Sequence, residues 1–208
     1  MSAGEKMKKE RTDLLVTAYH EAGHAAAAYF QELPFTEVHI IPGKGCLGKL
    51  EQEPVAFDTY PKGDTTFIDL EKRIIKAFAG IVAEAHHTGR LQWRYGAADF
   101  EAAFGLAMLR HSEGSFAEVE AFLKYARVRT HELVKHPHHW AAIGALASAL
   151  VERQRLSYTE AADVMQSALA PLWRSEGHPR SWVELHRSNA TSIGLAQALT
   201  RPGLRRLK

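Results

Sequence analysis

Two histidines and a glutamate within five residues carry the clearest chemical signal in this sequence. His20, Glu21 and His24 form the pattern H-E-x-x-H. Residues four apart share one face of an α-helix, so both imidazoles can bind one metal ion. Zinc accepts imidazole nitrogen and leaves room for water beside three protein ligands, and Glu21 can take a proton from that water. The pattern predicts one Zn2+ ion with Glu21 as general base; the alternative is that His24 is a hydrogen-bonded histidine of the core.

The other histidines, which bring the total to 12, do not repeat this spacing. His131 and His136 are five residues apart, roughly 140° around a helix, so they cannot both face one metal ion. The group formed by His136, His138 and His139 near Pro137 could bind a stray cation, but its composition favours a solvated loop. The remaining histidine pair, at positions 86 and 87, suits a helix end, where positive groups complement the helix dipole.

A catalytic zinc site needs a third ligand, which the motif does not supply. The longer pattern H-E-x-x-H-x-x-G-x-x-H fails, because Ala27 and Phe30 occupy its last two defined positions. Two acids elsewhere are candidates. Asp99 follows a run of small residues at an expected helix start, and Glu84 lies in an apolar helical segment where a lone carboxylate is costly without a partner. Spacing alone leaves both candidates open.

The elements that must position these residues are mainly helical. Apolar residues recur at helical spacing in six segments: 12–31, 69–89, 99–111, 116–133, 140–153 and 157–173. The β-branched segment 36–41 predicts a strand, with 46–51 pairing back as a hairpin and 52–64 forming a surface loop. We therefore expect a mainly α fold with a small β-sheet near the N-terminal third, a zincin-like H-E-x-x-H helix and a helical C-terminal half.

Several of these segments resemble the protease domain of the FtsH-type ATP-dependent zinc metalloproteases, peptidase family M41. The similar segments are T-A-Y-H-E-A-G-H-A at 17–25, V-H-I-I-P at 38–42, G-C-L-G at 45–48, A-G-I-V-A-E at 79–84 and G-A-A-D-F-E-A at 96–102. The sequence departs from the family at Ile81, where the family has Arg, and has one residue fewer before Asp99. The resemblance covers roughly residues 10–110. It implies that Asp99 is the third zinc ligand and that Glu84 orients a ligand imidazole.

The resemblance also implies a domain organisation. It predicts a zinc metallopeptidase core over residues 1–110 and a helical extension of the same domain over 111–175. A partly flexible C-terminal tail would occupy 176–208. Family members form hexameric rings, so the resemblance raises a homo-oligomer as an expectation, although one sequence cannot locate its interface.

Composition narrows the remaining function classes. Twenty-six Lys and Arg against 24 Asp and Glu give a net charge of +2, too balanced to favour a nucleic-acid partner. No apolar run approaches the length of a membrane span, and the N-terminus lacks the apolar stretch of a signal peptide, so we expect a cytoplasmic protein. The sequence contains no G-x-x-x-x-G-K-[ST] phosphate loop, so we expect activity independent of ATP.

The resulting expectation is a zinc-dependent endopeptidase that hydrolyses unfolded or flexible polypeptides. Two alternatives stay open: a non-catalytic interaction or assembly module that keeps the fold, and a zinc amidase acting on a small substrate. The expected substrate-binding residues are Val38, His39, Ile40 and Ile41, because an extended peptide can pair with an exposed strand edge. If this strand is instead central in its sheet, its edges are covered and it cannot serve in this way.

Overall fold

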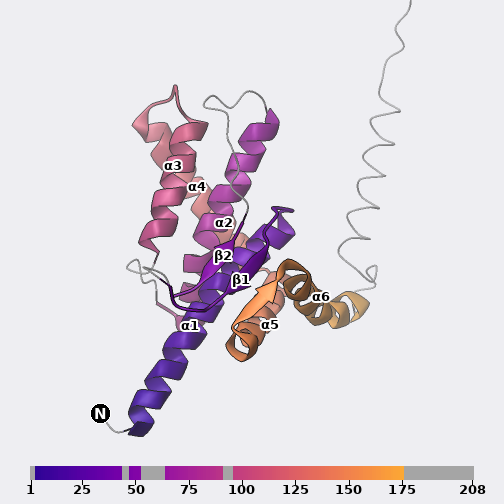
Figure 1. Ribbon diagram of the computed structural model, residues 1–208. Helices are drawn as coiled ribbons and strands as arrows, with labels where there is room; N and C mark the ends of the chain where they lie inside the picture. The colour runs from indigo at the N-terminus through magenta and orange to yellow at the C-terminus, as the bar shows by residue number, and fades with distance from the viewer. Residues whose placement is uncertain (1–2, 44–46, 53–63, 91–95, 176–208) are drawn as a thin grey trace, which may run out of the picture. The chain divides into compact units, whose positions relative to one another are not determined.

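The computed structural model describes residues 3–43, 47–52, 64–90 and 96–175 (Figure 1). These residues form six helices: α1 (Ala3–Phe30), α2 (Asp64–Thr88), α3 (Ala97–Arg110), α4 (Phe116–Lys135), α5 (Pro137–Arg153) and α6 (Tyr158–Ser175). Three short strands, β1 (Glu37–His39), β2 (Lys49–Glu51) and β3 (Arg155–Ser157), form one antiparallel sheet. The predicted mainly α fold with a small sheet is confirmed. The predicted tail at 176–208 and most of the predicted loop at 52–64 lie outside the described residues.

The chain divides into two compact units, residues 1–165 and 166–208, with the boundary inside α6. In the first unit, α1 packs against α2 and α5, while α3 and α4 pack on α2 (Figure 1). The residues between α2, α3 and α4 form an apolar core: Ile74, Ala77, Phe78, Ile81, Ala103, Ala107, Val119, Leu123 and Ala126. Among the described residues, none of the helices is long and apolar enough to cross a membrane.

Small residues bring α1 unusually close to α2. The alanines at 25–28 have no exposed surface. A Cβ atom on Gly23 would lie 2.7 Å from the Cβ of Ala83, closer than two such atoms ever approach. Gly23 is therefore needed for the two helices to pack at this distance, which brings the H-E-x-x-H face of α1 against α2.

The sheet order, β2–β1–β3, corrects one prediction made from the sequence. The segment 36–41 was expected to offer an exposed edge, but β1 is the central strand: Val38 pairs with Leu50 of β2 and with Leu156 of β3. Just past the strand, the backbone N–H of Ile40 donates to the carbonyl of Gln154 at 2.9 Å. Both edges of β1 are thus already paired, and Val38 and Ile40 are buried. An extended peptide cannot add to this strand.

The strand β3 was not predicted, although the helix that follows it was. Ser157 and Glu160 form a capping box at the start of that helix: the Ser157 hydroxyl accepts from the Glu160 N–H, and the Ser157 N–H donates to Glu160 Oε2 at 2.9 Å. Before the strand, α5 ends at Gln154, which has a left-handed φ of 64°. This conformation reverses the chain, so residues 155–157 reach β1.

Candidate metal centre

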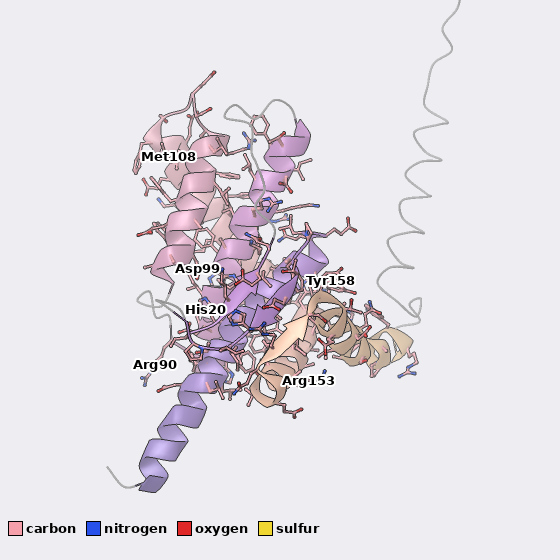
Figure 2. The ribbon with its side chains drawn as sticks, viewed as in Figure 1. His20, Arg90, Asp99, Met108, Arg153 and Tyr158 are labelled. Atoms are coloured by element: carbon pink, nitrogen blue, oxygen red, sulfur yellow. The ribbon has the colours of Figure 1, made fainter. Side chains whose placement is uncertain are left out.

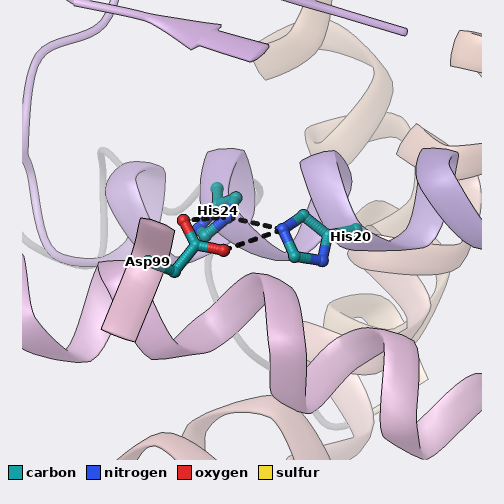
Figure 3. Close-up of side chains that lie close together, drawn as sticks. All are labelled: His20, His24 and Asp99. Carbon is teal, nitrogen blue, oxygen red and sulfur yellow. Dashed lines mark hydrogen bonds and ion pairs between the residues drawn. The ribbon is translucent and has the colours of Figure 1, made fainter. Parts of the chain in front are cut away.

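Three predicted residues from two helices meet beside the sheet. His20 and His24 are one turn apart on α1, and Asp99 lies in the first turn of α3 (Figure 2). Figure 3 shows the two imidazoles and the carboxylate pointing toward one another. Among the described residues, they are the one group of three histidine, cysteine or acidic side chains whose ligand atoms converge in this way.

The distances within this group are compatible with a metal site. The Nε2 atoms of His20 and His24 are 3.1 Å apart. Asp99 Oδ2 lies 3.0 Å from His20 Nε2, and Asp99 Oδ1 lies 3.3 Å from His24 Nε2. Metal–nitrogen bonds of about 2.0–2.1 Å in a tetrahedral arrangement hold two donor atoms roughly 3.3 Å apart. The three side chains therefore converge at nearly the spacing that a common tetrahedral ion requires.

Each imidazole is held by its other nitrogen. His24 Nδ1 donates to the backbone carbonyl of Lys76 at 2.8 Å, and His20 Nδ1 donates to Glu84 Oε2 at 3.1 Å. With Nδ1 protonated in both rings, each Nε2 of a neutral imidazole presents a lone pair. Two lone pairs and a carboxylate facing one another repel unless a metal ion or, in metal-free protein, a proton on His20 Nε2 lies between them. The donor set, two imidazole nitrogens and a carboxylate oxygen, suits zinc.

The surroundings of this group are buried on one side and open on the other. The side chain of Asp99 is 24% exposed, whereas His20, His24 and Glu84 are buried. Glu84 Oε1 is buried and has no hydrogen-bond partner among the described residues. A buried carboxylate oxygen left unpaired is costly, and the hydrogen bond that Glu84 Oε2 accepts from the His20 ring offsets part of this cost while orienting the ring.

Carboxylates also set the charge of the group. Burial alone would lower the pKa of His20, but hydrogen bonds to Asp99 and Glu84 outweigh it and raise that pKa to about 10. Burial pushes the pKa of Asp99 upward, while the charge of His24 and the hydrogen bonds from both rings hold it well below its usual range. The site therefore favours a positive charge between its acceptors, which is the property that a metal-binding group needs.

Glu21, the predicted general base, lies next to this group and does not belong to it. Its side chain is buried, and burial raises the pKa of its carboxyl group. Gly48, which precedes β2, packs directly over it: a Cβ atom there would lie 2.7 Å from Glu21 Cγ and 2.8 Å from the His39 carbonyl oxygen. The absence of a side chain at Gly48 leaves room for the Glu21 carboxylate between α1 and the sheet.

Two further glycines fix the ligands. Gly80 on α2 faces the His24 ring, and a Cβ atom there would overlap the imidazole. Gly96, just before α3, packs on the side chain of Ile81 in the same manner. Close contact at Gly96 brings the start of α3 against α2, which carries Asp99 to the two histidines. Ile81 thus has a packing role at the position where the M41 pattern has Arg.

The structure brings together five of the predicted site residues: His20, Glu21, His24, Asp99 and Glu84. The other four lie on or after β1, where Val38 and Ile40 are buried, His39 is half-buried and Ile41 is exposed. Sequence reasoning missed two contributions. The Lys76 carbonyl has no sequence signal, because every residue has one, whereas the packing role of Gly80 could have been inferred from a glycine inside an apolar helix.

No protein-family model matches this chain, and no curated protein matches its sequence.

Proposed function

We propose that this protein is a zinc-dependent endopeptidase that cleaves unfolded or flexible polypeptides. The observation that carries the proposal is the convergence of His20, His24 and Asp99 beside the buried carboxylate of Glu21. A non-catalytic module needs neither the converging acceptors nor a carboxylate next to them. Both features are what hydrolysis by an activated water requires.

In this proposal each residue has a distinct task. His20, His24 and Asp99 hold the zinc ion, which would supply a Lewis acid that acidifies water and polarises a peptide carbonyl. Glu84 and the Lys76 carbonyl keep both rings in the tautomer that presents Nε2. Glu21 accepts the proton of the attacking water at its carboxylate and delivers that proton to the amine that leaves.

The resemblance to peptidase family M41 supports the same assignment. Asp99 reaches both imidazoles although one residue is missing before it, so the shorter spacing does not prevent the ligand role that the family implies. We propose that the chain is an M41-type peptidase that needs no ATP for the cleavage of flexible chains. Its substrates would be polypeptides that already present an extended backbone.

Peptide access is proposed at β2, in place of β1. Among the described residues, no strand pairs with the outer edge of β2. Gly48 immediately precedes this strand and touches Glu21, so the edge begins next to the proposed base. An extended peptide that adds to β2 by main-chain hydrogen bonds would pass close to the metal centre.

The variant Glu21→Gln tests the proposal, because it keeps the shape and hydrogen bonding of Glu21 but removes the proton acceptor. We expect one zinc per chain in both proteins, and a kcat for unfolded casein or a flexible peptide that falls about 10²–10⁴-fold in the variant. Glu101→Gln, an exposed change on α3, serves as the control and should cleave normally. Zinc-free wild-type protein would favour the interaction module, and zinc without proteolysis would favour the amidase.

A further inference from the structure

Lys76 links the metal centre to the end of the sheet. Its backbone carbonyl accepts the hydrogen bond from His24 Nδ1. Its ammonium group donates to Gln52 Oε1 at 2.6 Å, and Gln52 is the residue that follows β2. One residue of α2 thus contacts a proposed zinc ligand with its backbone and the end of the proposed substrate strand with its side chain.

The charge on this side chain is not matched by its partner. Gln52 is neutral, and within the described part of the chain no carboxylate forms an ion pair with Lys76. Nearby cations do have a carboxylate partner: Lys49 pairs with Glu51 at 2.8 Å, and Arg73 pairs with Asp69 at 2.8 Å. The Asp99 carboxylate and the Arg73 guanidinium both lie close enough to act on the charge of Lys76.

We propose that the Lys76 ammonium binds a carboxylate of the peptide substrate and thereby selects substrates that carry a negative charge near the cleaved bond. This inference rests on the proposed peptidase function. The carboxylate can belong to the C-terminus of the peptide or to an Asp or Glu side chain, since both present the same acceptor oxygens. A carboxylate forms a charge-assisted bond that is stronger than the present bond to an amide, and the half-buried position of Lys76 limits its screening by salt.

A purely structural role for Lys76 makes a different prediction. If the ammonium only fastens the end of β2 to α2, then removing either partner of the hydrogen bond has the same effect. Lys76→Met and Gln52→Ala would then lower thermal stability by similar amounts, and neither would change the choice of substrate. If Lys76 binds substrate, Gln52→Ala leaves the charge in place and the preference persists.

The experiment uses one flexible, internally quenched peptide in several forms. The reference form is neutral and amidated; one form has a free C-terminal carboxylate, and others carry Glu or, as controls, Gln at each position flanking the cleaved bond. For wild-type protein we expect kcat/KM to be about 10-fold higher for a form with a carboxylate at one of these places than for its neutral counterpart. The form that gains identifies the source of the carboxylate.

The readout is the ratio of kcat/KM between charged and neutral forms, in which any general defect of a variant cancels. Lys76→Met should reduce this ratio to near one, while Lys76→Arg and Gln52→Ala retain most of it. Lys124→Met on α4, where Lys124 pairs with Glu120, removes the same charge elsewhere and should keep the wild-type ratio. Zinc content and thermal unfolding show whether each variant is folded.

Three results would overturn the inference. Equal cleavage of all forms by wild-type protein excludes the carboxylate site but leaves the peptidase function intact. A charge preference that survives in Lys76→Met assigns the preference to another residue. Failure of zinc-loaded wild-type protein to cleave even the neutral reference peptide removes the proposed function, and the inference with it.

Discussion

The metal centre and the corner between α4 and α5 are both rich in histidine, yet they hold their rings in opposite ways. In the centre, His20 and His24 turn their free nitrogens toward each other and toward Asp99. In the corner, His139 donates from Nδ1 to the carbonyl of Leu133 at 2.7 Å, and its ring packs on Phe30 at 4.0 Å between centroids. The corner contains ring-to-ring contacts of His136 with His138 and His139, and within the described part of the chain His139 forms no ion pair with a carboxylate.

The different hydrogen-bond partners of His20 and His139 give the two rings opposite pKa shifts. Burial lowers the pKa of His20 and of His139 alike, since both rings are removed from water. At His20 two carboxylates reverse the effect, whereas at His139 one backbone hydrogen bond opposes it and the neighbouring His136 and His138 add to it, leaving a pKa of about 4. The comparison indicates that the carboxylates beside His20, and not the number of histidines, give the candidate site its preference for a positive charge.

Among the changes considered, removing the Asp99 carboxylate is expected to have the largest effect on zinc binding. Asp99→Ala should weaken zinc binding more than 100-fold, since that is about the upper limit for losing a group that only orients a ligand. His139→Gln in the corner should leave the zinc stoichiometry unchanged. Competition with a chromogenic chelator measures both. If Asp99→Ala keeps its zinc while Glu84→Ala loses it, the two carboxylates have exchanged roles.

A smaller loss is expected from Gly80→Ala, which leaves every donor atom in place. The added methyl group overlaps the His24 ring, so the ring or the α1–α2 contact must shift. We expect a destabilisation of about 1–2 kcal/mol and zinc binding weakened roughly 10-fold. Gly105→Ala on α3 is the matched control, because nothing lies within 4 Å of its Cβ position. That change should stabilise the protein by about 0.5–1 kcal/mol.

Equal stability of the two glycine variants in urea unfolding, with unchanged zinc affinity, would show that packing under His24 does not preorganise the centre. The metal site would then depend on its donor atoms alone, and the close contact between α1 and α2 would be a feature of the core.

The helices and the facing pair of histidines could be predicted because their signals are local. His20 and His24 share a helix face by spacing alone, and the capping box at Ser157 needs only four residues. The third candidate ligand was inferred from a resemblance, since nothing in the spacing of Asp99 points to His20, which lies 79 positions earlier, or to His24. Its placement depends on contacts between α2 and α3 such as that of Gly96 with Ile81.

The sheet shows why the rest could not be predicted. β1 is central because β3, three residues long and 118 positions further along the chain, covers its second edge. A strand of that length has too few residues for an alternating pattern to stand out, and its partner is fixed only by tertiary packing. The side chain of Lys76 is similar: it donates a hydrogen bond to Gln52 and is influenced by the charge of Asp99, and the sequence brings neither residue near it.

The smallest expected effect is at His139 in the corner, where the free energy of unfolding should depend on pH because the buried ring is kept neutral. Burial holds the pKa of His139 at about 4, below the value of 6.5 in an unfolded chain. As the pH falls from 6.5 toward 4, His139 binds a proton in the unfolded chain but not in the folded protein. The contribution of this ring to stability is therefore complete above pH 6.5 and is lost progressively below it. His20, with its raised pKa, stays protonated in the folded metal-free protein over this range, while in the unfolded chain it titrates near 6.5; its contribution is the same in both proteins and cancels from their comparison. His139→Gln keeps a donor for the Leu133 carbonyl but cannot titrate. Its free energy of unfolding, measured in urea from pH 7.5 to 4.5 without metal, should therefore fall less than that of the wild type, by on the order of 1 kcal/mol once partial exposure is allowed for. Parallel curves for the two proteins would mean that the ring takes up its proton in place, and the contrast between the two histidine groups would then reduce to their geometry.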